Sequence, residues 1–469
     1  MSLAHADRVL VVTLSAEVYT KSVGTRRRFR RVLVENLQAA LSRSGRPAGV
    51  LRLDSGRLAI PTDDPDRDAD AARHVFGIQR VERATPVAWT GLADLADAVA
   101  ASARTAVAGR TFAVRVRRHG EHDFGSMDAE RVIGARLLPY SSGVDLDHPE
   151  VTVTVLVVQD RAWVVDRAWD GPGGLPLGTQ EPCLSLLSGG FDSPVAAWLI
   201  MRRGSPVDFL HLQLRCAQTD HALAVASQLW RTWGTGTSPL AWVIDFAAVE
   251  RAISTAVPPT YRQVVLKQLM LSAADRLAGE LDVPALVTGE SVGQVSSQTL
   301  RHLHEIDAVC SRLVLRPLTG LDKHEIIDRA RTIGTQELSA RAVELCDLSG
   351  GRPVAVAARA PELLRARTLA LQALDDGPLP RRVVALEHWL PGMDLVPVVD
   401  RPPAGAVLVA DGERIPTEGP VVLTGGRAVH RATRLANGGR DVAVQLVTSR
   451  VAAPGPGRAE AARAAAGAS

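Results

Sequence analysis

A glycine pair followed by an aspartate stands between an apolar run and a helical run in the middle of the chain. The stretch reads LSLLSGGFDSPVAAW, residues 184–198. Glycines let backbone N–H groups close around an anion, and the N-terminus of a following helix adds positive potential. Pro194 suits the first helical position, with Ser193 as the cap. No Lys-Ser or Lys-Thr pair follows the glycines, so this is not the common nucleotide loop. We predict a phosphate site, with a ligand-free turn as the alternative.

The elements around this loop predict a parallel sheet. Between Pro182 and Arg365, short apolar strands alternate with helices. Strands are expected at CLSLL, VDFLHLQL, LAWVIDF, ALVTG and LVLRPL, and helices at 194–203, 221–233, 262–279 and 323–333. Nearly continuous apolar strands indicate a sheet covered by helices on both faces, a doubly wound α/β fold. Ligands of such sheets bind at the carboxyl ends of the strands, where the glycine loop lies.

The first 170 residues predict α+β units. RVLVVTLSA reads as a strand, and 26–42 has helical apolar spacing. The acidic stretch PTDDPDRDAD, from Pro61, is expected to be a loop at a domain boundary. GLADLADAVAASARTAV and DAERVIGARLLPYS read as helices, while VTVTVLVVQD and RAWVVDRAW read as two strands joined by a tight turn. TFAVRVRR alternates apolar and basic residues, as a half-buried strand with one basic face does.

Charge and cysteine content restrict the class of protein. The net charge of +3 is too small to indicate a partner, but basic residues cluster at 26–31 and 115–119. Each cluster is either a solvated face or a contact for nucleic-acid phosphates. The four cysteines form no CxxC pair, which is typical of reduced thiols. The apolar run Val9–Leu14 is too short for a signal peptide or a membrane span, so we expect a soluble, cytoplasmic protein.

The glycine loop resembles that of the PP-loop ATP pyrophosphatases, which release the β- and γ-phosphates of ATP as pyrophosphate. ALVTGESVGQVSSQTL and LRPLTGLDKHEIIDRARTIGT further resemble the tRNA 4-thiouridine synthetase family. FAVRVRRHGEHDFGSMDAERVIGARL resembles the THUMP domain of that family, and AEVYTKSVGTRRRFRRVLVENL its ferredoxin-like leader. The resemblance spans about residues 8–350 in matching domain order. It implies adenylation of uridine O4 at tRNA position 8, then displacement of AMP by a persulfide sulfur to give 4-thiouridine. Some members also supply sulfur for thiamine thiazole.

The resemblance also implies roles for single residues. Asp192 is the expected Mg²⁺ ligand and Lys323 the residue that stabilises charge during adenyl transfer. The expected ATP-binding residues are Leu186, Leu187, Ser188, Gly189, Gly190, Phe191, Asp192, Ser193, Lys267, Gly289 and Gln298. In the basic strand, the expected tRNA-binding residues are Arg115, Arg117 and Arg118.

Sulfur delivery is where the sequence departs from part of the family. Cys346 matches a family cysteine that attacks or resolves a persulfide; a buried structural cysteine is the alternative. The role of Cys216, at a strand end, stays open. The region 378–450 resembles a shortened rhodanese domain, but Thr424 stands where the persulfide cysteine belongs. A separate cysteine desulfurase or other persulfide donor is therefore the expected partner, together with tRNA and a possible second copy of the chain.

The expected domains are a ferredoxin-like leader (1–63), a THUMP domain (64–169), a PP-loop domain (180–365), a degenerate rhodanese-like domain (378–450) and a disordered tail (451–469). Two rival functions remain. The chain could sulfurate a small molecule, since its C-terminus is degenerate, although the basic strand argues against this. It could also bind tRNA without catalysis, although the intact SGGFDS, TGES and LDKHE motifs argue against that.

Overall fold

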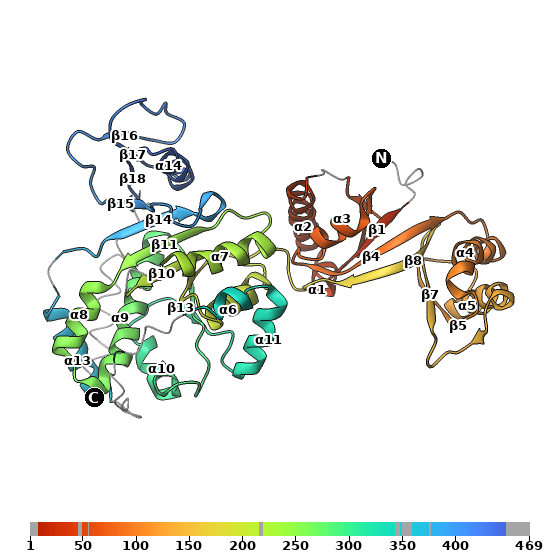
Figure 1. Ribbon diagram of the computed structural model, residues 1–469, viewed down its shortest axis with the longest axis horizontal. Coiled ribbons are helices and arrows are strands. Elements are labelled where there is room, and N and C mark those ends of the chain that lie inside the picture. Colours follow the sequence, from red (N-terminus) through yellow and green to blue (C-terminus); the bar gives the residue numbers. More distant parts are fainter. Residues whose placement is uncertain are drawn as a thin grey trace.

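The computed structural model describes residues 8–45, 49–54, 56–214, 219–342, 348, 359–374 and 377–446. Cys216 and Cys346 lie outside these residues. The described chain forms two lobes, each built on one sheet (Figure 1). We call residues 8–170 the N-terminal lobe and residues 183–446 the C-terminal lobe. No helix among the described residues is long and apolar enough to cross a membrane.

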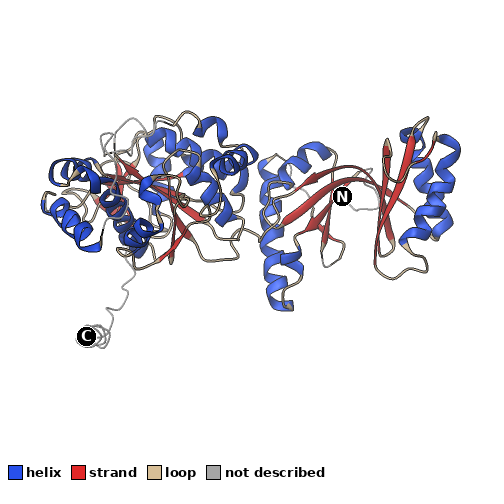
Figure 2. Cartoon of the chain, turned by 90° about the horizontal axis from the view of Figure 1, so that it is seen from below, coloured by secondary structure: helices blue, strands red, loops and turns tan. Residues whose placement is uncertain are grey.

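The N-terminal lobe is one eight-stranded sheet in the order β2-β3-β1-β4-β8-β7-β5-β6. Its strands are β1 (Val9–Leu14), β2 (Leu51–Arg52), β3 (Arg57–Pro61), β4 (Ile78–Val87), β5 (Thr111–His119), β6 (Gly143–Val144), β7 (Val151–Val158) and β8 (Arg161–Asp170). The long antiparallel strands β4 and β8 pass through both halves of the lobe. The leader and the THUMP-like half therefore share one sheet, with helices at its two ends (Figure 2).

Two groups of helices cover this sheet. The helices are α1 (Ala16–Tyr19), α2 (Val23–Arg43), α3 (Pro65–Ala72), α4 (Leu92–Val107), α5 (Ser126–Leu137) and the 3-10 turn η2 (Leu138–Tyr140). The apolar faces of α2 and α3 pack on β1, β3 and β4, while α4 and α5 pack on β5, β7 and β8.

The expectation of a loop from Pro61 is wrong, because α3 lies there. Asp64 caps this helix by accepting a hydrogen bond from the Arg67 N–H (3.4 Å), and Pro65 opens its first turn. Ala69 and Ala72 are fully buried against the leader. The leader core therefore continues past residue 63. Sequence reasoning gave the acidic residues too much weight, although Asp-Pro is also a helix-start signal.

The C-terminal lobe confirms the predicted parallel sheet. Its strands are β9 (Cys183–Leu186), β10 (Val207–Gln213), β11 (Leu240–Asp245), β12 (Ala285–Val287) and β13 (Leu313–Leu315), in the spatial order β13-β12-β9-β10-β11. All neighbouring pairs in this group are parallel. The order reverses between β9 and β12, and such a switch point opens a crevice at the carboxyl ends of the two strands.

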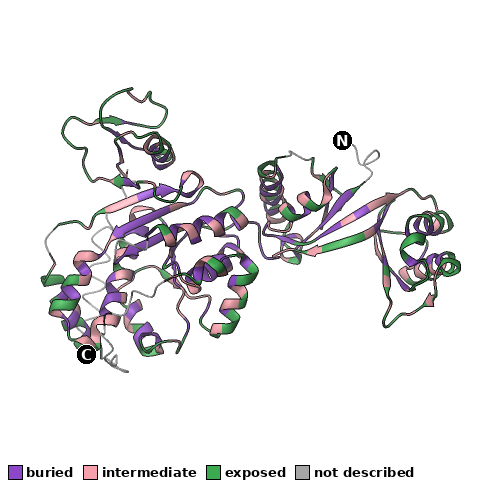
Figure 3. Cartoon of the chain, in the orientation of Figure 1, coloured by how far each residue is buried: buried purple, intermediate pink, exposed green. Residues whose placement is uncertain are grey.

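Helices cover both faces of this sheet, and Figure 3 shows its strands mostly buried. One face packs against α6 (Asp192–Met201), α7 (Thr219–Trp233) and α11 (Lys323–Ile333). The other packs against α8 (Ala247–Ala256), α9 (Pro259–Glu280) and α13 (Ala360–Gln372). The 3-10 turn η4 (Ser296–Gln298) and helices α10 (Leu300–Asp307) and α12 (Gln336–Ser339) complete this part of the lobe.

The region after residue 378 extends the same sheet. It contributes β14 (Arg381–Ala385), η5 (Leu386–His388), β15 (Val396–Val398), β16 (Val407–Val409), β17 (Val421–Leu423), α14 (Ala428–Asn437) and β18 (Val442–Val444). β14 pairs antiparallel with β11, so the ten strands form one continuous sheet. The region is therefore bound to the parallel sheet through backbone hydrogen bonds.

The linker 171–182 is anchored to both lobes. The Leu175 N–H donates to the Arg202 carbonyl (3.0 Å), and the amide of Asn36, in α2, donates to the Leu177 carbonyl (2.9 Å). Gly174, at φ +72°, lies so close to Arg202 that a Cβ there would come within 2.2 Å of its carbonyl oxygen. The linker is thus a packed connection between the lobes.

Candidate active site

The glycine loop lies at the switch point, between the end of β9 and the first turn of α6. Its Ser188 N–H donates to the Ser193 hydroxyl (3.2 Å), and the Ser339 hydroxyl donates to the Gly190 carbonyl (3.2 Å). Gly189 adopts φ +83°, a left-handed conformation that favours glycine. The helix begins at Asp192, so Ser193 lies inside its first turn and binds back to the loop instead of capping the helix. The loop thus has the backbone form that an anion site requires.

Asp192 and Lys323 meet beside this loop. The Lys323 Nζ donates to Asp192 Oδ1 (2.7 Å), and the Gln294 amide donates to Asp192 Oδ2 (3.0 Å). Lys323 opens α11, whose N-terminus is held by a capping box between Asp322 and Glu325. Its side chain is 41% exposed, and the ammonium nitrogen lies 5.6 Å from the centre of the Phe191 ring. A positive charge is therefore positioned at the mouth of the phosphate loop.

Gly289 approaches the loop, and the structure explains why a glycine is needed. A Cβ at this position would come within 2.9 Å of the Asp192 carbonyl carbon and of the Ser193 nitrogen. Backbone atoms cannot move aside as a flexible side chain can. Gly289, just after β12, thus lies close to the start of α6, and its expected close approach to the nucleotide stays a prediction.

Lys267 lies in a partly buried ion-pair network. Its Nζ donates to Glu290 Oε1 (2.9 Å), while the Arg316 Nε donates to Glu290 Oε2 (2.8 Å). Arg316 also binds Asp307 through both terminal nitrogens. Burial alone raises the pKa of Glu290, but Lys267 and Arg316 outweigh it and hold that pKa below its ordinary value. Lys267 is thus paired with Glu290 in the structure, and its contact with ATP stays a prediction.

The remaining predicted ATP-binding residues surround the loop in different ways. Leu186 pairs with Leu210 in the sheet. The Leu187 N–H donates to the Leu210 carbonyl (2.8 Å), and the expected lining of the nucleotide site by Leu186 and Leu187 stays a prediction. Gln298 is buried, and its side-chain oxygen has no hydrogen-bond partner among the described residues.

Two histidines beside the loop were missed by sequence reasoning. Nδ1 of His211, on β10, bonds the Leu187 carbonyl (3.0 Å), and the Cδ2 atom of His221, on α7, lies 2.9 Å from where a Cβ of Gly189 would stand. Burial lowers the pKa of His211, so its ring is neutral. The Nε2 atoms of both rings are buried and lack a partner within the described parts of the chain. A histidine within the apolar run VDFLHLQL was the available signal.

The predicted tRNA-binding arginines have unequal freedom. Arg115 is exposed and bonds only backbone carbonyls among the described contacts. The guanidinium of Arg117 instead pairs with Glu82, whose side chain is 1% exposed. Arg118 bonds the Gly120 carbonyl (3.3 Å) and the His122 ring (3.1 Å). Arg117 is thus committed to a buried carboxylate, which alternation along the strand could not reveal.

The two described cysteines do not have the character of nucleophiles. Burial raises the pKa of the Cys183 thiol. Burial, with help from nearby Asp275, raises the pKa of Cys310 to about 11. Because a thiolate is the reactive form, both are unreactive near neutral pH. The candidate sulfur carrier Cys346 lies outside the described residues, so its role stays a prediction.

With this geometry in place, the chain can be compared with known proteins. Residues 178–366 match the family model "Thiamine biosynthesis protein (ThiI)", and residues 90–165 match the THUMP domain. A probable tRNA sulfurtransferase of Aeropyrum pernix is 43% identical over 345 residues, which cover 72% of this chain and 86% of the relative. The chain belongs to the tRNA sulfurtransferase family. The tRNA sulfurtransferase of an Escherichia coli O139:H28 strain is 37% identical over 74% of this chain and 73% of its own.

A solved member of this family has the same architecture. It is described as a 4-thiouridine synthetase–RNA complex with bound ATP, and it matches 80% of this chain and 98% of its own with a TM-score of 0.64 at 25% identity. The THUMP match covers α4, β5, α5, β7 and part of β8, and the ThiI match covers the parallel sheet. Residues 378–450 lie beyond both matches, so their resemblance to rhodanese, like the division into domains, stays a prediction.

Proposed function

We propose that this chain uses ATP to transfer sulfur to the uridine at position 8 of tRNA, forming 4-thiouridine. The observation that carries the proposal is the glycine loop with Asp192 and Lys323 at the switch point of the sheet, in a member of the tRNA sulfurtransferase family. ATP and tRNA are the substrates of this reaction. The cytoplasmic location and the additional supply of sulfur to thiamine synthesis remain expectations.

In the first step, the uracil O4 attacks the α-phosphorus of ATP and pyrophosphate leaves. The backbone N–H groups of Ser188–Ser193 and the N-terminus of α6 are proposed to hold the leaving pyrophosphate. The Lys323 ammonium, exposed at the loop mouth, would stabilise the negative charge that develops during transfer. The oxygen at C4 thereby becomes part of AMP, a good leaving group.

In the second step, the terminal sulfur of a persulfide attacks C4 and AMP leaves. A thiol then attacks the remaining S–S bond, which releases the thiocarbonyl and forms a disulfide. We propose Cys346 for the attacking or resolving thiol and a cysteine desulfurase as the source of the persulfide. A homodimer is the oligomeric state that the family suggests.

The residues at the loop suit Mg²⁺. Mg²⁺ prefers carboxylate oxygens together with substrate phosphates. Each oxygen of Asp192 accepts one hydrogen bond, which leaves lone pairs for a cation, and the side chain is 24% exposed. Asp192 would hold the ion, which neutralises charge on the phosphates when bound. The hydrogen bonds from Lys323 and Gln294 orient that carboxylate.

The experiment that tests the proposal is a reconstitution. The purified chain is mixed with ATP, Mg²⁺, unmodified tRNA, and a cysteine desulfurase with cysteine. Release of pyrophosphate that depends on tRNA, followed by 4-thiouridine in the digested tRNA, is the expected result. Pyrophosphate release with a small molecule but not with tRNA would favour the rival substrate. No release with either would favour a binding protein without catalysis.

A further inference from the structure

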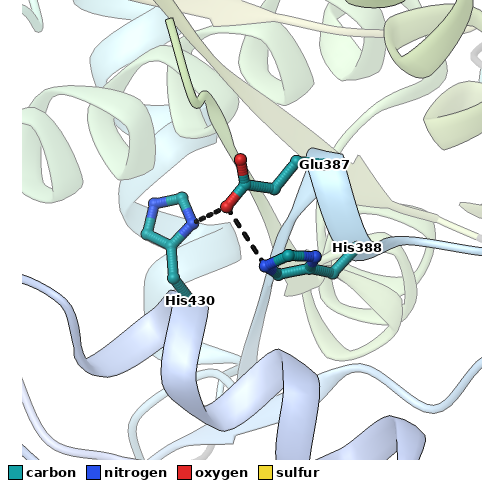
Figure 4. Close-up of side chains that lie close together, drawn as sticks. All are labelled: Glu387, His388 and His430. Carbon is teal, nitrogen blue, oxygen red and sulfur yellow. Dashed lines mark hydrogen bonds and ion pairs between the residues drawn. The ribbon is translucent and has the colours of Figure 1, made fainter. Parts of the chain in front are cut away.

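Three side chains with metal-binding atoms converge where the C-terminal region meets the catalytic sheet. Glu387 and His388 lie in η5, directly after β14, and His430 lies on α14 (Figure 4). Glu387 Oε1 lies 3.1 Å from His388 Nε2 and 2.8 Å from His430 Nδ1. One ligand atom from each residue lies within 4.8 Å of the others. Among the described residues, this is the one such group of three.

We propose that Glu387, His388 and His430 bind a divalent transition-metal ion of the zinc type, with water in the fourth position. Zinc lies about 2.0–2.2 Å from nitrogen and oxygen ligands, so tetrahedral ligand atoms stand about 3.3 Å apart. The two distances from Glu387 are already close to this spacing. Two imidazoles with one carboxylate form a ligand set that suits zinc and its neighbours better than Mg²⁺ or Ca²⁺.

Contacts behind the ligands hold them in position. The Ser238 hydroxyl, just before β11, donates to Glu387 Oε2 (3.1 Å) and leaves Oε1 directed at the histidines. The Asn437 amide donates to the His388 carbonyl (2.9 Å). The three ligand side chains are only 22–29% exposed. Outer contacts that orient ligands in this way are typical of metal sites.

The same seam is joined by packing, which gives the metal a structural consequence. The Thr433 hydroxyl of α14 accepts a hydrogen bond from the Ala385 N–H of β14 (3.1 Å), and both residues are fully buried. A metal bound beside this contact would connect α14 to the end of β14. It would therefore stabilise the attachment of the C-terminal region, without a part in adenylation or sulfur transfer.

The alternative is a hydrogen-bonded triad without metal, in which Glu387 accepts bonds from both histidines. Equilibrium dialysis of the full chain against Zn²⁺, and visible absorption of the Co²⁺ form, separate the two. We expect the wild type to bind one equivalent of Zn²⁺ per chain. His430→Ala and Glu387→Gln should lose this binding, with the affinity for Zn²⁺ weakened more than about 100-fold. Ser238→Ala should weaken binding about 10-fold.

The control is His304→Ala, which removes an exposed histidine on α10 far along the chain from the cluster. It should keep the full equivalent. His388→Ala provides a third ligand variant, and its side chain is 27% exposed. Zn²⁺ should raise the unfolding temperature of the wild type and of His304→Ala, but not of the ligand variants. Equal metal binding by the wild type and all three ligand variants, or none by the wild type, would overturn the proposal.

Discussion

Replacing Gly289 by alanine tests whether the approach of β12 to α6 sets the geometry of the loop. The new Cβ would stand 2.9 Å from the Asp192 carbonyl carbon and the Ser193 nitrogen, whereas ordinary contacts begin at 3.4 Å. The start of α6 must therefore move by about 0.5 Å. Overpacking of this kind costs about 1–3 kcal/mol in stability. Because a displacement of about 1 Å can reduce a rate about 100-fold, half that distance predicts a loss of about tenfold in kcat.

The assay is tRNA-dependent pyrophosphate release under saturating ATP, with thermal unfolding measured in parallel. Gly320→Ala is the matched control, since a Cβ there meets no atom within 4 Å and the residue lies in the same lobe. The control should keep the wild-type rate and unfolding temperature. If Gly289→Ala kept both as well, the loop would tolerate the displacement and the reasoning would be wrong.

Five further substitutions have distinct expected results. Lys323→Ala should lower kcat by about 100–1000-fold with a smaller effect on the KM for ATP, measured by steady-state kinetics. Glu290→Gln should cost about 1–3 kcal/mol in the free energy of unfolding at pH 7, since it leaves the partly buried Lys267 without its carboxylate and Arg316 with Asp307 alone. The pKa of Glu290 is lowered, so its ion pairs stabilise the fold above about pH 4.5 and this stabilisation is lost as the pH falls further. Denaturant titrations should therefore show that the difference in the free energy of unfolding between wild type and Glu290→Gln becomes smaller at lower pH. Arg115→Ala should reduce the steepness of the plot of log binding constant for tRNA against log salt concentration by about 0.7–0.9. Arg117→Ala should instead lower the free energy of unfolding by about 1–3 kcal/mol. Equal effects of the two substitutions would contradict their different contacts. Cys346→Ala should block 4-thiouridine formation in a single-turnover assay while sparing pyrophosphate release, and an unchanged rate would mean that sulfur reaches the uridine directly from the donor.

The order of elements was predictable because it depends on local patterns. The apolar strands and the helix at 323–333 stand where the sequence placed them, and the glycine loop follows its strand as expected. A continuous apolar run is typical of a buried parallel strand, and a loop glycine is recognised from the strand before it and the helix after it. The meeting of Asp192 and Lys323 followed only from resemblance, since 131 positions separate them.

What the sequence could not provide is how each charge is used. From the sequence alone, Lys267 and Arg117 are expected to be free cations, yet each pairs with a carboxylate from a distant element. Gly289 needs its small size because of the backbone of α6, which only the crossing of two elements reveals. The metal cluster likewise combines η5 with a helix 42 residues later, so no local spacing marked it.

The shared sheet of the N-terminal lobe has a consequence for how a nucleotide is chosen. Because β4 and β8 pair along both halves of the sheet, and the linker is bonded to Arg202, at the end of α6, and to Asn36, the lobe is an arm joined to the helix that follows the glycine loop. An RNA bound at the outer half of this arm would reach the glycine loop at a fixed distance from its binding point. The enzyme would then select a uridine by its distance from the bound end of the folded RNA, and the identity of the neighbouring bases would have little effect on this selection. If the RNA stem is lengthened by one base pair, the modified uridine should be the one that lies at the original distance from the bound end.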